Sequence, residues 1–586
     1  MTSVRQFSRY ARRIGQLADN APKTLHRSAR CSSTQAQRQI VENENGKRIF
    51  SSPYGEYTFI EMFTHDYVWR NLQDFADRIA LECAATGRKY TYSQARDASN
   101  YIARSILNMG LRKGDVVALI SPNYPETVLA LLGILEADLT VTTVNPFYTP
   151  EEIARQLKSS GAKAIITVTE IAKNVAAAAK TTMAPNAPFM VIDDGTGPIP
   201  EGTIPFLDLI TRGKTLPPIK HSHDNINDVA ILPYSSGTTG LPKGVMLTHK
   251  NLVANMDMTE QTVSGKMWEF TSPDFQEVIP VILPFFHIFG LNSLTLPRLS
   301  TGTKLITVPK FVPAQILQLM ATQKMTGLYI VPPILLFLNA APHVKKEMLE
   351  NVHHAIIGAA PLSETDVQRF YDKFGLDNEK MKFCQGYGMT ETSPVVSFEV
   401  TGTKPGSIGK TIVGCEMRLV DPLTNKDVSG PGENGEIWVR GPHVMKGYLN
   451  NEAATREMMH EDWLKTGDIA YHDEENFFYV TDRLKELIKV KGFQVAPAEL
   501  EALLRTHPDV EEAAVIGVPD ARHGEVPKAF VLTKKGAAPK PEQLQDFIKG
   551  KVASYKELLG GVTFVDNIPK NSSGKILRIQ LRNMSK

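Results

Sequence analysis

The sequence predicts an α/β protein, with a large N-terminal α/β body built on parallel sheets and a small C-terminal α+β domain. Two observations lead to this prediction. Apolar runs of strand length alternate with segments of helical periodicity through most of the chain, which is typical of βαβ units. From about Thr481 the composition becomes rich in Lys and Glu, and the predicted strands and helices become short. A chain of 586 residues is also too long for one compact core.

The clearest βα units of the N-terminal body lie between residues 115 and 168. Asp115–Ile120 is an apolar run of strand length, and a helix is expected from Pro125 to about Leu135. Thr149–Glu152 combines a capping box with proline at the first helical position, so a second helix begins there. Gly161 closes that helix, and Ala164–Val168 is the next predicted strand.

The C-terminal region reads as a small domain of roughly 100 residues. Its expected strands are Ala513–Gly517 and Ala529–Leu532, and its expected helices are Pro497–Leu504 and Pro541–Ile548. By the period-two rule, Lys485, Leu487, Lys489 and Lys491 share one face of a strand, opposite Ile488 and Val490. We therefore expect solvent or an anion beside the lysine face. The predicted divisions are residues 1–40, 41–480 and 481–586.

The first 40 residues differ from the rest of the chain. They hold seven arginines, one lysine and a single acidic residue, Asp19, with serines and small residues between them. An Arg-rich, Ser-rich, acid-poor and amphipathic segment is typical of a mitochondrial transit peptide, and a solvated disordered tail is the alternative. The chain ends Asn583-Met-Ser-Lys586, without a peroxisomal Ser-Lys-Leu. We expect the mitochondrial matrix, with peroxisomal or cytoplasmic residence as alternatives.

Composition excludes several functional classes. The formal net charge of +2 gives no reason to expect a nucleic-acid partner. The cysteines Cys31, Cys83, Cys384 and Cys415 lie far apart, without the spacing of a zinc site or a disulfide framework. No apolar run reaches the about 18–20 residues that a membrane-spanning helix needs, so no transmembrane segment is expected.

The segment Tyr234–Val245, with the sequence YSSGTTGLPKGV, is the strongest local signal in the chain. Its glycines let the backbone approach a ligand closely, while its hydroxyls and Lys243 supply donors and a charge for phosphate oxygens. The spacing differs from that of a Walker A loop. Taken alone, the segment fits either a phosphate-binding loop or a flexible Gly/Ser/Thr surface loop.

Further motifs follow this loop in a fixed order, and the whole set resembles the adenylate-forming superfamily. That superfamily includes acyl-CoA synthetases, 4-coumarate–CoA ligases, beetle luciferases and peptide-synthetase adenylation domains. The motifs extend over nearly the whole chain and are Pro284–Gly290, Gly358–Pro361, Gln385–Glu391, Gly435-Glu436, Thr466–Asp468, Asp482–Lys489 and Pro569–Lys575. The run Lys485–Glu501 is most similar to the 4-coumarate–CoA ligase and luciferase branch.

The resemblance implies an ATP-dependent acid–thiol ligase. Such an enzyme converts a fatty or aromatic carboxylic acid to its acyl-CoA through an acyl-adenylate, releasing AMP and pyrophosphate. ATP, coenzyme A and Mg²⁺ are the implied co-substrates and metal. The resemblance also implies that the C-terminal domain is a mobile lid, hinged near Asp482, that turns between the adenylation and thioester-forming steps.

The resemblance assigns most nucleotide and CoA contacts residue by residue. The glycine-rich loop would hold the β- and γ-phosphates, Thr390 the α-phosphate and Glu391 the Mg²⁺. Asp468 would accept the ribose hydroxyls, with Arg483 as its companion on the nucleotide. The residues implied to contact ATP are Ser235, Ser236, Gly237, Thr238, Thr239, Lys243, Gly358, Ala359, Ala360, Gln385, Gly386, Tyr387, Asp468, Arg483, Lys485 and Lys489. Lys310, Lys491 and Gly492 match CoA contacts of this branch.

The remaining implied residues concern the carboxylic acid. Lys575 would bridge the attacking carboxylate and the α-phosphate, stabilising charge in the transition state. His287 matches a gate beside the carboxylate. The implied acyl pocket comprises Ile288, Phe289, Ser293, Gly386, Gly388, Pro394 and Val395. Phe289 stands where plant 4-coumarate ligases usually have tyrosine, so the polar handle for a phenol is missing and an apolar wall remains.

Three alternatives stay open. A luciferase-like adenylating oxygenase shares these motifs. An adenylation domain that loads a carrier protein is less favoured, because Lys491-Gly492 matches contacts to free CoA. A catalytically inactive binding homologue is opposed by the intact set of Lys243, Glu391, Asp468, Arg483 and Lys575.

Overall fold

The computed structural model describes residues 40–42, 48–220, 225–235, 242–264, 266–359, 364–428, 430–484, 486–490, 493–520, 522–570, 574 and 576–585. The predicted transit peptide lies outside these ranges except for its last residue, so it stays a prediction. Within these ranges, each helix is either too short or too polar to cross a membrane.

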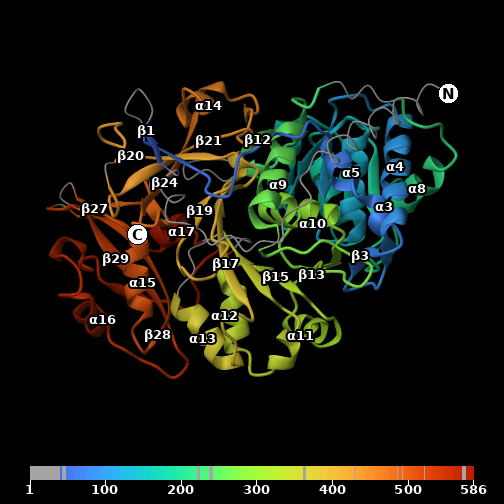
Figure 1. The fold of residues 1–586 in the computed structure, drawn as a ribbon. Helices are drawn as coiled ribbons and strands as arrows, with labels where there is room; N and C mark the ends of the chain where they lie inside the picture. The colour runs from blue at the N-terminus through green and yellow to red at the C-terminus, as the bar shows by residue number, and fades with distance from the viewer. Residues whose placement is uncertain are drawn as a thin grey trace. The chain divides into compact units, whose positions relative to one another are not determined.

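One sheet carries the predicted βαβ units (Figure 1). Its strands lie in the order β11-β12-β10-β6-β5-β7-β8-β9, with β22 paired to β12, and the run from β10 to β9 is parallel. The strands are β5 (Val116–Ile120), β6 (Thr140–Thr143), β7 (Ala162–Val168), β8 (Phe189–Ile192), β9 (Ile204–Pro205), β10 (Val229–Ile231), β11 (Tyr234–Ser235), β12 (Lys243–Thr248) and β22 (Gly447–Tyr448). Its accompanying helices are α4 (Tyr92–Asn108), α5 (Pro125–Glu136), α6 (Pro150–Ser160), α7 (Ala172–Ala179), α8 (Phe206–Gly213) and α9 (His249–Val263).

The local signals predicted in this region are confirmed. Thr149 and Glu152 form the capping box of α6, because the Glu152 N–H donates to Thr149 Oγ1 and the Thr149 N–H donates to the Glu152 carboxylate. Gly161 ends α6 with φ of +66°, a left-handed conformation that glycine adopts at little cost.

Two further sheets of the body combine parallel and antiparallel strand pairs. The first has the order β13-β14-β3-β4 and the second the order β15-β16-β17-β18-β19. Their strands are β3 (Ile79–Cys83), β4 (Lys89–Thr91), β13 (Val278–Val281), β14 (Lys304–Thr307), β15 (Gly327–Ile330), β16 (His354–Ile357), β17 (Lys382–Gly388), β18 (Val395–Phe398) and β19 (Lys410–Thr411). The helices of this region are α2 (Thr64–Trp69), α3 (Leu72–Phe75), α10 (Leu296–Ser300), α11 (Pro313–Thr322), α12 (Pro332–Ala340) and α13 (Glu364–Phe374), with the π-helix η3 (Phe289–Thr295) and the 3₁₀-helix η5 (Thr390–Thr392).

An antiparallel sheet was not foreseen from the sequence. Its order is β1-β2-β20-β21-β24-β23, with β25 paired to β24. The strands are β1 (Ile40–Glu42), β2 (Arg48–Ser51), β20 (Glu416–Val420), β21 (Gly435–Arg440), β23 (Met459–His460), β24 (Trp463–His472) and β25 (Phe478–Arg483), and α14 (Glu452–Met458) precedes β23. This sheet matters for the site because it carries Asp468 and Arg483.

The small C-terminal domain is α+β, as predicted. Helices α15 and α16 pack together beside a sheet with the order β27-β26-β29-β28 and with β30 paired to β29 (Figure 1). The elements are β26 (Ile488–Val490), β27 (Phe493–Val495), α15 (Pro497–Arg505), β28 (Val510–Asp520), β29 (Gly524–Thr533), α16 (Pro541–Ile548), β30 (Val562–Phe564) and α17 (Arg578–Met584). Strands β28 and β29 form a longer hairpin than the sequence predicted.

The predicted strand face around Lys489 needs a correction. Strand β26 begins only at Ile488, and before it the Leu487 N–H donates to the Arg483 carbonyl, which is a turn-type bond rather than a strand-pairing bond. Leu487 is therefore buried, instead of sharing an outward face with Lys489. The alternation holds within β26 itself, where Ile488 and Val490 are buried and Lys489 is exposed.

Candidate functional site: a carboxylate-centred nucleotide and acid site

The glycine-rich loop joins two paired strands whose ends adjoin Glu391. Strands β11 and β12 pair antiparallel, with Ser235 opposite Lys243. Ser235 Oγ donates a hydrogen bond of 2.8 Å to Glu391 Oε1, and Tyr448 Oη donates another of 2.8 Å to the same oxygen. Lys243 Nζ lies 5.1 Å from the centroid of the Tyr448 ring. A buried carboxylate, two hydroxyls and a cation therefore meet at the base of the loop.

Strand pairing explains how residues so distant in sequence reach Glu391. Tyr448 belongs to β22, which pairs with β12 so that Tyr448 lies opposite Val245. Glu391 belongs to η5, directly after β17, and its carbonyl accepts a 2.8 Å hydrogen bond from the Met445 N–H. The segment before Tyr448 thus holds the Glu391 backbone, while Tyr448 itself holds the carboxylate.

A second buried carboxylate, Asp468, lies between Tyr387 and Arg483. Tyr387 Oη donates to Asp468 Oδ2 at 2.7 Å, and Arg483 Nε lies 3.0 Å from Asp468 Oδ1. Asp468 faces Arg483 because β24 and β25 pair in that register. Burial, followed by the adjacent Asp468 charge, raises the pKa of Tyr387 well above its usual value. The phenol stays protonated and donates to the carboxylate.

Glu436 supports this second carboxylate from the neighbouring strand. Glu436 Oε1 accepts a 2.9 Å hydrogen bond from the Gly467 N–H, and the Asp468 N–H donates to Thr466 Oγ1 at 3.1 Å. These bonds fix the turn that presents Asp468, which gives a physical reason for the Gly435-Glu436 and Thr466–Asp468 motifs.

The glycines of the predicted nucleotide segment allow close packing. A Cβ added to Gly358 would lie 3.2 Å from the Phe289 ring, and one added to Gly386 would lie 3.1 Å from Phe398. Gly358 follows β16 and Gln385 lies on β17, and the two strands pair in parallel. Ala359, which follows Gly358, has φ of +71°. The structure therefore brings the predicted nucleotide segment against the predicted acyl residue Phe289.

His287 is held as a neutral imidazole. Its Nδ1 accepts a 3.3 Å hydrogen bond from the Phe289 N–H, so its proton lies on Nε2. Burial lowers the pKa of His287 to about 4. At neutral pH this side chain is an uncharged N–H donor.

Asn123, which the sequence did not single out, positions the His287 motif. Asn123 Oδ1 accepts from the Phe285 N–H at 2.9 Å, while its Nδ2 donates to the Val281 carbonyl at 3.0 Å and the Leu283 carbonyl at 2.9 Å. The side chain is 4% exposed, so these bonds form away from water. No local pattern marks such a residue, because its partners lie about 160 residues further along the chain.

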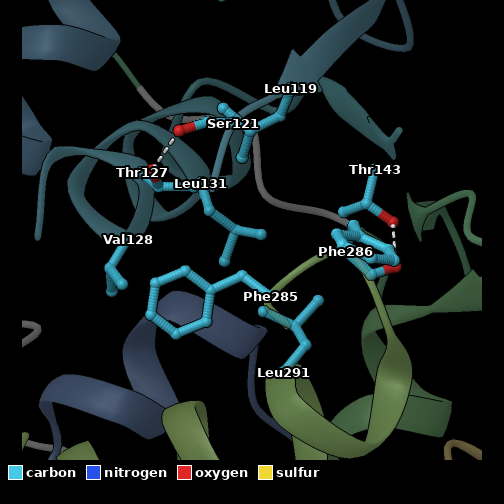
Figure 2. Close-up of a pocket in the computed structure, with 9 residues that line it drawn as sticks. All are labelled: Leu119, Ser121, Thr127, Val128, Leu131, Thr143, Phe285, Phe286 and Leu291. Carbon is cyan, nitrogen blue, oxygen red and sulfur yellow. Dashed lines mark hydrogen bonds between the residues drawn. The ribbon is translucent and has the colours of Figure 1, made fainter. Parts of the chain in front are cut away.

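The π-helix separates two apolar regions. In the wide turns of this helix, residues four apart such as Phe289 and Ser293 share one side, and Leu291 lies on the other. Figure 2 shows Leu291 beside Phe285, with Val128 and Leu131 of α5 opposite them. The cavity there has a volume of about 10 Å³, room for one water at most. This side is therefore packing that supports the motif, and the predicted acyl residues lie on the opposite side.

The segment after η5 completes the predicted acyl pocket. A Cβ on Gly388 would lie 1.8 Å from the Pro394 carbonyl oxygen, so only glycine fits there. The Met389 N–H donates to that same oxygen at 3.1 Å, and Gly388 faces Val395 across β17 and β18. Ile288, Ser293, Pro394 and Val395 are all buried.

Lys310 lies apart from this cluster. It is exposed and borders a cavity of about 250 Å³ that is also lined by Tyr124, Phe147 and Glu170. None of the other predicted site residues lines this cavity in the described part of the chain. Phe147, at its edge, is 69% exposed.

Several predicted residues lie outside the described residues. They are Ser236, Gly237, Thr238, Thr239, Ala360, Lys485, Lys491, Gly492 and Lys575. Their assigned roles stay predictions. Lys489 is described and exposed, and its backbone N–H donates to the Glu525 carboxylate at 2.9 Å.

Comparison with known proteins gives consistent matches along the chain. The family model for AMP-binding enzymes matches residues 68–449, and the model for the AMP-binding enzyme C-terminal domain matches residues 499–575. The chain is 40% identical over 563 residues to 4-coumarate–CoA ligase 1 of Arabidopsis thaliana, covering 94% of this chain and 98% of that protein. It is 39% identical to 4-coumarate–CoA ligase 1 of Solanum tuberosum, over 92% of this chain and 97% of that protein.

Solved structures agree. ATP-bound MatB from Rhodopseudomonas palustris matches with a TM-score of 0.78 and 29% identity, over 89% of this chain and 99% of that one. The anthranilate CoA ligase AuaEII, in complex with anthranoyl-AMP, matches with a TM-score of 0.80 and 26% identity, over 89% of this chain and 97% of that one. The chain belongs to the family of AMP-binding enzymes, the adenylate-forming superfamily.

Proposed function

We propose that this chain activates a fatty or aromatic carboxylic acid with ATP and transfers the acyl group to coenzyme A. It is an AMP-forming acid–thiol ligase that works through an acyl-adenylate. The observation that carries the residue assignments is the pair of buried carboxylates, Glu391 and Asp468. Arg483 is paired with Asp468, and the negative charges of Asp468, Glu486 and Glu391 together favour its charged form and raise its pKa.

The proposed first step joins the acid to the α-phosphate. A carboxylate oxygen attacks the α-phosphorus, the bond to the bridging oxygen breaks, and pyrophosphate leaves with the electron pair. Asp468 accepts the ribose hydroxyls, which fixes the nucleotide. Lys243 and Arg483, with Lys575 as predicted, offset the gathered negative charge. His287 donates its Nε2–H to the acid.

In the proposed second step, the CoA thiolate attacks the acyl carbonyl carbon and AMP leaves with the former carboxylate oxygen. Lys491 and Gly492 are the predicted contacts for CoA in this step. Lys310 is the predicted contact on the body, and the cavity it borders offers room for part of a large co-substrate.

Glu391 is the proposed Mg²⁺ ligand, and its surroundings fit the metal. The described residues contain no cluster of three or more His, Cys, Asp or Glu side chains that would form a complete protein cage. Mg²⁺ is usually held by one or two carboxylates together with substrate phosphates and waters, which matches a single carboxylate at the base of a phosphate loop. When bound, the metal supplies positive charge to the phosphates. Titrating activity with Mg²⁺ in wild type and in Glu391→Gln tests this. We expect the variant to need a much higher Mg²⁺ concentration than wild type for half-maximal activity.

The proposed acid class rests on the apolar wall around Phe289. This ring packs against Gly358 and carries no hydroxyl, while the neighbouring Ile288 is buried. A wall of this kind favours an alkyl chain or an unsubstituted ring over a phenol. Pyrophosphate release measured with straight-chain acids of increasing length, benzoate and 4-coumarate tests the proposal. We expect fatty acids or benzoate to give the highest kcat/KM, and a clear preference for 4-coumarate would contradict the assignment.

We also propose that the protein works in mitochondria. The support is the composition of the first 40 residues, with seven arginines and one acidic residue. Import of the full chain into isolated mitochondria, followed by analysis of the N-terminus of the imported protein, tests this.

A further inference from the structure

We propose that Asn255 and Asn292 are positioning residues that set the acyl-pocket wall Ser393–Val395 and so determine how well the acid binds. This inference rests on the proposed function, because Pro394 and Val395 are acyl-pocket residues only if the chain activates an acid. Neither asparagine belongs to a recognised motif of the sequence.

Asn255 holds Val395 on both sides of its peptide unit. Its Nδ2 donates to the Val395 carbonyl at 2.7 Å, and its Oδ1 accepts from the Val395 N–H at 3.1 Å. The side chain lies on α9 and is 0% exposed. The Asn255 amide thus bonds to the backbone N–H and carbonyl of Val395 as a further strand would. The two residues are 140 positions apart in the sequence.

Asn292 holds the preceding part of the wall. Its Nδ2 donates to the Ser393 carbonyl at 2.6 Å and to the Leu252 carbonyl of α9 at 3.3 Å. The side chain is 1% exposed and lies on the π-helix between Phe289 and Ser293. Asn292 therefore connects two parts of the predicted acyl pocket to the same helix, α9. One part is its own π-helix, which carries Phe289 and Ser293, and the other is the wall Ser393–Val395.

The wall has little freedom elsewhere. The Pro394 carbonyl accepts from the Met389 N–H at 3.1 Å and lies against Gly388, where no side chain fits. A shift of Val395 would therefore displace the segment that leads into Thr390 and Glu391. Leaving a buried backbone N–H or carbonyl without a hydrogen bond costs free energy. The two amides therefore favour the one position of the segment Ser393–Val395 in which these bonds form.

The test compares KM for the acid with KM for ATP. Asn255→Asp keeps an acceptor for the Val395 N–H but places an oxygen against the Val395 carbonyl. Asn292→Leu keeps the branching at Cγ and removes the donor to Ser393 without adding charge. The control is Asn339→Asp, since Asn339 Nδ2 donates to the Asp366 carbonyl at 2.9 Å between α12 and α13, outside the predicted site. The probe acid is the member of the straight-chain, benzoate and 4-coumarate panel with the highest kcat/KM for wild type.

We expect Asn255→Asp and Asn292→Leu to raise KM for the acid about tenfold, as loss of one such hydrogen bond predicts, while KM for ATP changes less than twofold. The preference among the acids should also change, because the wall shape changes. If Asn255→Asp does not fold, Asn292→Leu decides the question.

Two outcomes would overturn the inference: equal changes in both KM values, or variants that behave like Asn339→Asp. A wild-type protein that releases no pyrophosphate with any acid would instead count against the proposed function. The two failures are therefore distinguishable.

Discussion

Asp468 and Glu391 are both buried carboxylates, but their partners differ. Asp468 has a cation, Arg483, and a phenol, Tyr387. The Glu391 carboxylate instead accepts hydrogen bonds from the hydroxyls of Ser235 and Tyr448. Asp468 already has a cation in direct contact, whereas the described partners that bond directly to the Glu391 carboxylate are hydroxyls and Lys243 only lies nearby, so the Glu391 carboxylate is better placed to take a bound metal ion. This contrast supports a ribose acceptor at Asp468 and a metal ligand at Glu391.

The first prediction concerns Asp468. Asp468→Ala should raise KM for ATP by roughly tenfold to a hundredfold, because the ribose loses a charge-assisted acceptor worth on the order of 1.5–3 kcal/mol. Tyr387→Phe is the matched control, since it removes only the hydrogen bond to Asp468 and keeps the ring. It should change KM for ATP much less. Unchanged ATP affinity in Asp468→Ala would show that Asp468 only shapes a turn.

The motif residues could be proposed from the sequence, but their supports could not. Asp468, Arg483 and Glu391 stand in short patterns with a recognisable order. Tyr448 lies 57 residues beyond Glu391, and Asn255 reaches Val395 over 140 residues. Such contacts are made by tertiary folding and leave no local periodicity to read.

Helices and strands were predicted best where the residues that determine them lie next to them in the sequence. The capping box at Thr149 and the helix Pro541–Ile548 were placed from sequence, because their determinants lie within a few residues. The antiparallel sheet that carries Asp468 was missed. Its strand β2 pairs with β20, with Phe50 opposite Met417. Because these strands are far apart in the sequence, no hairpin pattern predicts that they pair. The face predicted around Lys489 was wrong at Leu487, which is buried and precedes the start of β26.

The second prediction separates the two faces of the C-terminal domain. Lys575→Ala should lower pyrophosphate release by about a hundredfold or more, as expected for losing one preorganised charge donor. The same variant should still convert a supplied acyl-adenylate and CoA to thioester. Lys491→Ala should leave pyrophosphate release near the wild-type rate and strongly lower the formation of thioester. Equal losses in both half-reactions for both folded variants would show that the domain does not divide the work.

The third prediction concerns the N-terminal segment. Removing residues 1–33 should leave folding and activity intact but abolish mitochondrial import, because an arginine-rich, acid-poor segment acts as an address rather than as core. Fluorescence microscopy of tagged full-length and shortened chains measures the difference. Cytosolic residence of the full-length chain, with its N-terminus uncleaved, would refute the prediction.

For the whole molecule, the desolvated histidines His287, His354 and His443 predict acid lability. Burial lowers the pKa of His287 to about 4 and the pKa values of His354 and His443 to about 3, from an ordinary 6.5. Between pH 4 and 6.5 the unfolded chain therefore binds more protons than the folded one. Stability should fall as the pH falls through this window, by at most about 1.4 kcal/mol per pH unit for each histidine.

Thermal unfolding across this pH range measures the effect. His354→Gln should show a smaller drop in Tm between pH 6.5 and pH 4.5 than wild type, because one proton-uptake site is removed. The slope is compared rather than the absolute Tm, since the substitution also changes packing. Identical slopes in the two proteins would contradict this account.

The central claim is that the acid is activated as an acyl-adenylate before it reaches CoA. The most direct measurement uses an acid labelled with ¹⁸O in both carboxylate positions, incubated with ATP, Mg²⁺ and CoA, and mass spectrometry of the products. The account predicts one ¹⁸O in AMP and one in the acyl-CoA, because the oxygen that attacks the α-phosphorus leaves with AMP. Unlabelled AMP, or ¹⁸O in inorganic phosphate together with ADP, would contradict it.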